Sequence, residues 1–191
     1  LALADFVAPM GQRDYVGGFV VTSGPNEVEI AKRFRAEGDD YSAILAQALS
    51  DRFAEALAEA LHQRVRREFW GYAPDEGFAP QELIAEPYKG IRPAPGYPAQ
   101  PDHSEKATLF DLLGATKSIG VELTEGYSMW PGSSVSGLYI AQPESYYFGV
   151  AKVEEDQVRD YAARKNMAQA DVEHWLSNLL NYNPGESEGA A

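Results

Sequence analysis

The most regular pattern of apolar positions in the chain lies between Tyr41 and Phe69. Apolar residues recur there at steps of three and four, which match the helical period of about 3.6 residues. Asp39 and Asp40 precede the pattern and are suited to cap a helix. The pattern therefore predicts a long amphipathic helix from about Tyr41 to Phe69. The apolar residues expected on its buried stripe are Ile44, Leu45, Ala48, Leu49, Phe53, Ala56, Leu57, Ala60, Leu61, Val65 and Phe69.

Shorter segments are typical either of helices or of strands, and they do not follow a strict strand–helix–strand repeat. Turn residues such as Pro131-Gly132 and Pro143-Glu144 separate the β-rich segments, which suggests an antiparallel meander. We therefore expect an α+β fold, with a central antiparallel sheet beside the long helix. The expected helices are 27–35, 81–86, 104–113, 155–165 and 169–179. The expected strands are 15–21, 121–129, 135–142 and 146–153.

Composition restricts the possible partners and chemistry of the 191 residues. The formal net charge is -13, which disfavours nucleic acid and anionic membrane surfaces as partners. The chain has no cysteine, so disulfides and thiolate metal sites are excluded. The absence of cysteine also fits a protein of a reducing compartment. The three histidines are scattered in sequence and indicate no metal site. No apolar run is long enough to span a bilayer.

The segment from Gly90 to Pro98 is the most unusual part of the sequence. Its prolines restrict the backbone before any ligand arrives, which lowers the entropy cost of ordering. Arg92 offers paired donors for a carboxylate, Gly96 permits close approach to the backbone, and Tyr97 offers a flat face. These features fit a site for a small ligand with a carboxylate and a ring. They fit equally a rigid surface loop with an incidental arginine.

Motifs along the whole chain resemble one family. The run from Arg92 to Tyr97 is similar to the Arg-x-x-x-Gly-Tyr signature of the activation domain of cobalamin-dependent methionine synthase. The family pattern has a cysteine where this chain has Gln100, outside that signature. The flanking segments RREFWGYAP, DHSEK, SMWPGSSVSG and DQVRDYAARK also resemble the family and occur in the same order.

The resemblance implies a function within a larger methyltransferase. That enzyme moves a methyl group from methyltetrahydrofolate to homocysteine through cobalamin. Its activation domain binds S-adenosylmethionine over the corrin and supports reductive methylation of inactive cob(II)alamin, with an electron from flavodoxin or a flavoprotein reductase. Another module of the same polypeptide holds most of the cobalamin, and zinc belongs to a further module. The resemblance also implies a cytoplasmic protein and a domain without catalytic residues of its own.

Family positions that match this sequence give the expected binding residues. Glu55, Tyr147 and Phe148 are expected to contact S-adenosylmethionine beside the proline-rich loop, and Asp51 and Glu55 to face the cobalamin module. Asp51 equally fits a solvated helix face. The alternatives for Glu55 and Tyr147 are an ordinary surface charge of the helix and an aromatic residue of the core. We expect Glu55, the loop and Tyr147 to border one concave surface that is open on one side. The loop residues expected to hold the ligand are Arg92, Pro93, Ala94, Pro95, Gly96 and Tyr97.

The sequence also allows a prediction about each end of the chain. The apolar run from Leu1 to Val7 resembles the middle of a segment, so we expect residues 1–191 to be an activation domain without its N-terminal segment. The family also uses a carboxylate in that segment. Residues 183–191 are polar and are expected to fray. The alternative function is a non-catalytic docking module that caps cobalamin and recruits a flavoprotein.

Overall fold

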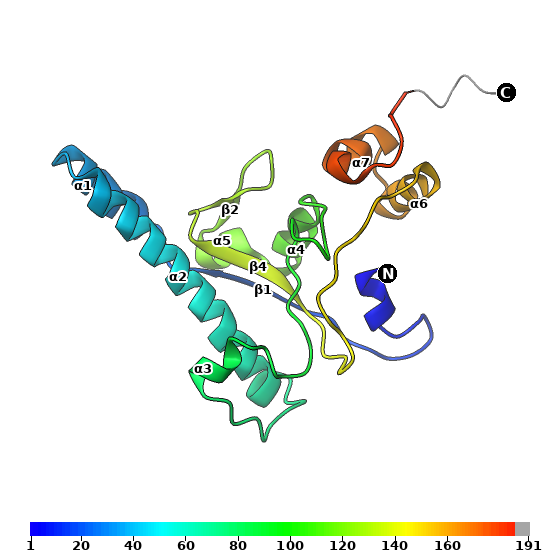
Figure 1. The fold of residues 1–191 in the computed structure, drawn as a ribbon, viewed down its shortest axis with the longest axis horizontal. Helices are drawn as coiled ribbons and strands as arrows, with labels where there is room; N and C mark the ends of the chain where they lie inside the picture. The colour runs from blue at the N-terminus through cyan, green and yellow to red at the C-terminus, as the bar shows by residue number, and fades with distance from the viewer. Residues whose placement is uncertain (186–191) are drawn as a thin grey trace.

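The computed structural model describes residues 1–185, and in this part of the chain the fold is a mixed α+β domain as expected. A two-stranded antiparallel sheet joins β1 (Gly17–Thr22) to β4 (Ser134–Tyr139), with Gly17 opposite Tyr139 and Thr22 opposite Ser134. Figure 1 shows this sheet between a long helical arm on one side and the C-terminal helices on the other. Most of the predicted tail, residues 186–191, lies outside the described residues.

The long helical arm consists of α1 (Asn26–Ala36) and α2 (Asp40–Arg64), which pack against each other. The Asp39 side chain caps α2 by accepting a 2.9 Å hydrogen bond from the Ser42 N–H. The helix continues as one π-helical turn, η2 (Val65–Phe69), so the predicted helix has the predicted extent. Its wider last turn brings Val65 and Arg66 into the interior.

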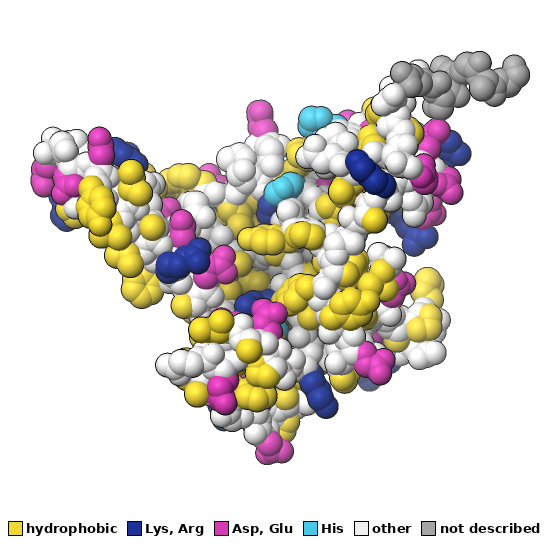
Figure 2. Space-filling view, viewed as in Figure 1, with side chains coloured by type: hydrophobic (Ala, Val, Ile, Leu, Met, Phe, Trp, Pro, Cys, Tyr) yellow, Lys and Arg dark blue, Asp and Glu magenta, His cyan; other side chains and the backbone are white. Residues whose placement is uncertain are grey.

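The buried face of α2 differs from the predicted one. Small side chains and a histidine face the interior, because alanine lets α1 and the sheet approach the helix closely. Val65 of the predicted stripe is buried and Leu61 packs against the core, but most of the larger apolar residues are exposed. Figure 2 shows hydrophobic side chains along this arm. The buried residues are Ala43, Ala54, Ala58 and His62. The predicted stripe residues that are exposed include Ile44, Leu45, Leu49, Phe53, Leu57 and Phe69.

The predicted antiparallel meander is wrong. Residues 121–129 form no continuous strand: they contribute β2 (Glu122–Leu123) and the first residue of β3 (Met129–Trp130), and these two short strands pair in a separate hairpin. Residues 146–153 form no strand of either sheet. The free edge of β4 is already occupied, because Ile91 exchanges two backbone hydrogen bonds with Ile140, at 2.9 and 3.0 Å. The proline-rich loop thus takes the place that the fourth strand was expected to fill.

The remaining helices surround the sheet or form a separate C-terminal unit. α4 and α5 pack against β1, whereas α6 and α7 bury Val158 and Val172 in a core of their own. None of the helices in residues 1–185 is long and apolar enough to cross a membrane. The shorter elements are η1 (Leu3–Phe6), α3 (Pro80–Leu83), α4 (Glu105–Leu113), α5 (Ala115–Ile119), α6 (Glu155–Lys165), α7 (Gln169–Trp175) and η3 (Ser177–Leu179).

Candidate functional site

The proline-rich loop is fixed to β4 and closed on itself by backbone hydrogen bonds. Beyond the Ile91 bridge, the Leu138 N–H donates to the Pro93 carbonyl at 2.9 Å. At the tip, the Gly96 N–H donates to the Gln100 carbonyl at 2.7 Å, and the Gln100 N–H donates to the Tyr97 carbonyl at 2.9 Å. With its prolines restricting φ, the loop presents a defined backbone surface.

Gly96 is required at the tip for two reasons. Its φ of +97° lies in a region that L-residues rarely adopt. A Cβ at this position would also lie 2.2 Å from Cε1 of His103, whose ring packs against the glycine. His103 in turn lies 2.8 Å, through Nδ1, from Nζ of Lys106. The segment that follows the loop therefore supports the turn that carries Tyr97.

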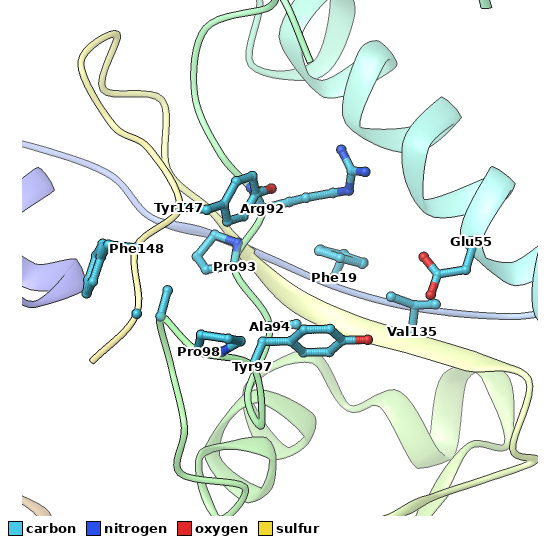
Figure 3. A pocket seen from close by; sticks show the side chains of 12 residues that line it. Phe19, Glu55, Arg92, Pro93, Ala94, Tyr97, Pro98, Val135, Tyr147 and Phe148 are labelled. Carbon is cyan, nitrogen blue, oxygen red and sulfur yellow. The ribbon is translucent and has the colours of Figure 1, made fainter. Parts of the chain in front are cut away.

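A cavity of about 420 Å³ lies between α2, the loop and the segment around Tyr147. Figure 3 shows the Glu55 carboxylate projecting from α2 toward this space, with Tyr97 on the loop side. The volume lies within the range of about 300–1,000 Å³ that small-molecule sites occupy. Tyr97 and Tyr147 are 61% and 44% exposed, so these walls face solvent. The lining residues are Phe19, Glu55, Arg92, Pro93, Ala94, Tyr97, Pro98, Ala99, Val135, Tyr147, Phe148 and Gly149.

The structure thus brings most of the residues predicted for the ligand site together. Pro95 and Gly96 do not line the cavity, because Pro95 is buried within the loop and Gly96 packs against His103. Asp51 also lies outside it. Its carboxylate accepts a 2.9 Å hydrogen bond from the Ser133 hydroxyl, which also binds the buried Glu27.

The Arg92 guanidinium does not project freely into the cavity. Nη2 lies 2.7 Å from a carboxylate oxygen of Glu59, and Nη1 donates to the Tyr88 hydroxyl at 2.6 Å. Nη1 also lies 3.3 Å from Nδ1 of His62. Figure 3 shows the guanidinium turned away from Pro93 and Tyr97. The backbone N–H of Arg92 donates to the Tyr147 hydroxyl at 3.0 Å, which ties two walls of the cavity together.

His62 must be neutral in this environment. Burial, reinforced by the nearby charges of Arg66 and Arg92, lowers the pKa of His62 to about 3. Its ring stacks on Tyr139 with centroids 5.1 Å apart, and Tyr139 stacks on Phe19 of the cavity wall at 4.7 Å. Sequence reasoning missed this group behind the cavity. The signal was present as helical spacing, because Glu55, Glu59 and His62 follow one another at steps of four and three.

The site is suited to binding and placing a ligand. Its cavity holds one carboxylate, from Glu55, among mainly apolar and aromatic walls. Within residues 1–185, no three histidine, aspartate or glutamate side chains are grouped so that they could hold a metal ion. The arrangement can select a small molecule with a positive group and an aromatic or apolar part.

Comparisons with known proteins agree on one family. Residues 1–166 match the family described as "Vitamin B12 dependent methionine synthase, activation domain". A solved structure, "Crystal Structure of the MetH Reactivation Domain bound to AdoHcy", is 55% identical in sequence with a TM-score of 0.93. The match covers 95% of this chain and 56% of that one, so the chain spans just over half of the solved relative. The chain belongs to the activation-domain family of vitamin B12-dependent methionine synthases.

Proposed function

We propose that this domain binds S-adenosylmethionine in the cavity between Glu55 and Tyr147, and so supports reactivation of a cobalamin-dependent methionine synthase. The convergence of these two residues with the Arg92–Tyr97 loop carries the proposal. Further support comes from the 55% identical relative, whose structure contains AdoHcy, the product left when S-adenosylmethionine loses its methyl group.

The chemistry of the cavity fits a sulfonium nucleoside. The ligand carries positive charge on its sulfonium and ammonium groups, and Glu55 supplies a carboxylate to meet it. Phe19 and Tyr97 offer apolar faces for the adenosine part. Glu59 and Tyr88 hold the Arg92 guanidinium behind the cavity wall, so Arg92 contributes to the cavity mainly through its backbone and its bond to Tyr147. Pro93 and Ala94 present the loop backbone to the ligand.

The role we propose is placement, without a general acid or base. Cobalamin held by another module would accept one electron from the reductant and then the methyl group of S-adenosylmethionine, and S-adenosylhomocysteine would remain in the cavity. The electron is proposed to come from flavodoxin or a flavoprotein reductase in the cytoplasm. The exposed ring of Tyr97 leaves the cavity accessible to a cobalamin module of the same polypeptide.

A segment preceding Leu1 in the whole protein is proposed to complete the domain. α2 carries alanines on its buried side and large apolar residues, such as Phe53 and Leu57, on its exposed side. A helix that is apolar on both sides is typical of the interior of a larger protein. A longer polypeptide that includes the preceding segment should therefore unfold at a higher temperature than the 191 residues alone. Equal unfolding temperatures would contradict this proposal.

Isothermal titration calorimetry of S-adenosylmethionine into the 191-residue chain tests the proposed binding. We expect saturable heat with one site, weakened by Glu55→Gln. Glu68→Gln is the matched control, because Glu68 is an exposed residue that pairs with Arg64 outside the cavity. The absence of saturable heat would contradict the binding proposal and favour a docking module without a ligand.

A further inference from the structure

One face of α2 and its π-helical extension carries a row of polar residues that continues behind the cavity. Glu55, Glu59, His62 and Arg66 follow at steps of four, three and four. At about 100° per residue these side chains fall within a sector of about 60° on the helix. Only Glu55 lines the cavity. The other three lie on the far side of the cavity wall, where they surround Tyr88 and the Arg92 side chain.

Arg66, in the second position of the π-helical turn, is the fixed end of this row. Its side chain is fully buried, and Nε and Nη2 bind the two carboxylate oxygens of Glu76 at 2.6 and 2.7 Å. Its guanidinium carbon also lies 3.7 Å from the centroid of the Tyr88 ring. A paired arginine in the interior has few alternative positions, so it holds the tyrosine ring in place.

Tyr88, held in place by Arg66, in turn restrains the Arg92 side chain. The Tyr88 hydroxyl accepts a 2.6 Å hydrogen bond from Arg92 Nη1 and donates to Glu59 at 3.3 Å. Glu59 in turn binds Arg92 Nη2 at 2.7 Å. The Arg92 guanidinium therefore has two hydrogen-bonding partners that are themselves linked. Because Tyr88 is 9% exposed, little solvent competes for these bonds.

Arg92 connects this buried group to the cavity wall. With its side chain held on the inner side, its backbone N–H donates to the Tyr147 hydroxyl, and Pro93 and Ala94 face the cavity. A shift of the guanidinium would move the start of the loop and its contact with Tyr147. Small displacements of a ligand-holding wall have large effects on binding and placement.

We propose that Arg66 and Tyr88 are positioning residues of the ligand site. Arg66, fixed by Glu76, holds the Tyr88 ring, and the Tyr88 hydroxyl fixes Arg92 so that the loop keeps its ligand-binding shape. This inference rests on the proposed function for the affinity it predicts. The order of the Arg92–Tyr97 loop is a second consequence that needs no ligand.

Tyr88→Phe tests the inference most directly, because it keeps the ring over Arg66 and removes only the hydroxyl. We expect the Kd for S-adenosylmethionine to rise roughly tenfold, the effect of one charge-assisted hydrogen bond. Tyr182→Phe is the matched control. It removes a tyrosine hydroxyl that binds Glu173 at 2.8 Å in the C-terminal unit, far along the chain from the cavity residues.

A double-mutant cycle separates positioning from general stability. In an Arg92→Ala background, Tyr88→Phe should change the Kd by less than twofold, because the guanidinium that the Tyr88 hydroxyl holds is gone. An unchanged Kd for Tyr88→Phe in the otherwise native chain would overturn the inference, as would a tenfold effect that persists without the Arg92 side chain. If Tyr88→Phe fails to fold, Glu59→Gln carries the same affinity and cycle predictions, because it weakens the other hold on Arg92.

Hydrogen exchange distinguishes failure of this inference from failure of the proposed function. Without ligand, Tyr88→Phe should speed amide exchange in residues 90–98 and leave α6 and α7 unchanged. If the native chain binds no S-adenosylmethionine, the proposed function fails, and faster exchange in the loop still supports the positioning role. Unchanged exchange in residues 90–98 would overturn the positioning role in either case.

Discussion

The hydroxyl of Tyr147 accepts a 3.0 Å hydrogen bond from the backbone N–H of Arg92. This bond joins the proline-rich loop to a segment that has no strand to hold it. Burial also raises the pKa of Tyr147 above the ordinary tyrosine value, so the side chain is a neutral phenol. The Tyr147 hydroxyl therefore helps to fix the shape of the cavity, and the Tyr147 side chain also lines it.

Tyr147→Phe removes this acceptor and leaves the ring in place. We expect a loss of about 1 kcal/mol in the free energy of unfolding, typical of one hydrogen bond, together with weaker binding of S-adenosylmethionine. Urea denaturation and calorimetry measure the two effects. Tyr146→Phe is the control, because Tyr146 packs on Phe6 outside the cavity. Equal behaviour of the two variants would show that the Arg92–Tyr147 bond has no role.

Stability should depend on pH through His62. Its pKa is about 3 in the folded chain and near 6.5 when unfolded, so the unfolded state binds more protons between these values. The free energy of unfolding should therefore fall as pH decreases through this window, by about 2 kcal/mol between pH 7 and pH 5 from this group alone. Chemical denaturation of the native chain and His62→Gln at both values isolates the effect. Parallel losses in the two proteins would contradict it.

The buried pair of Arg66 and Glu76 should contribute far more than an exposed pair. Glu76→Gln leaves the arginine charge in the interior without a counter-charge, which costs about 3–5 kcal/mol. Glu68→Gln breaks the exposed pair with Arg64 and should cost at most about 1 kcal/mol. Thermal and urea denaturation compare the two variants. Similar losses would mean that burial of the Arg66–Glu76 pair is not the deciding factor.

Gly96→Ala should distort the loop tip. The positive φ costs about 1–2 kcal/mol for an L-residue, and the new methyl group would collide with the His103 ring. We expect reduced stability and weaker ligand binding, with partial recovery when His103→Ala removes the ring. Gly77→Ala is the control, because a Cβ there meets no atom within 4 Å. A stable Gly96→Ala protein with native affinity would contradict the close packing of the loop on His103.

Local periodicity predicted the elements of this fold better than their packing. The extent of the long helix followed from steps of three and four, but its buried face did not, because both faces carry apolar residues and the smaller ones, such as Ala54 and Ala58, are buried. The meander was wrong because the Ile91 segment occupies the edge of β4. The periodicity of the Ile91 segment and of residues 146–153 does not show which of the two pairs with the edge of β4.

The residues around the candidate site could be predicted only in part, because contacts between distant segments also shape it. Family resemblance identified the loop, Glu55 and Tyr147, and the structure places all three around one cavity. The residues that hold the Arg92 side chain were not predicted, because they come from different segments of the chain. Arg66 is one of three arginines close together in the sequence near the end of the long helix, and it is fully buried against Glu76 in an irregular loop. Only the tertiary structure shows that pairing.

The structure of the 191-residue chain with bound S-adenosylhomocysteine, determined by crystallography, tests the central claim most directly. The account predicts the ligand between Glu55 and Tyr147, against Pro93 and Ala94, with the Arg92 guanidinium still bound to Tyr88. A ligand found in another part of the molecule, or an empty cavity in crystals grown at saturating ligand concentration, would contradict the account.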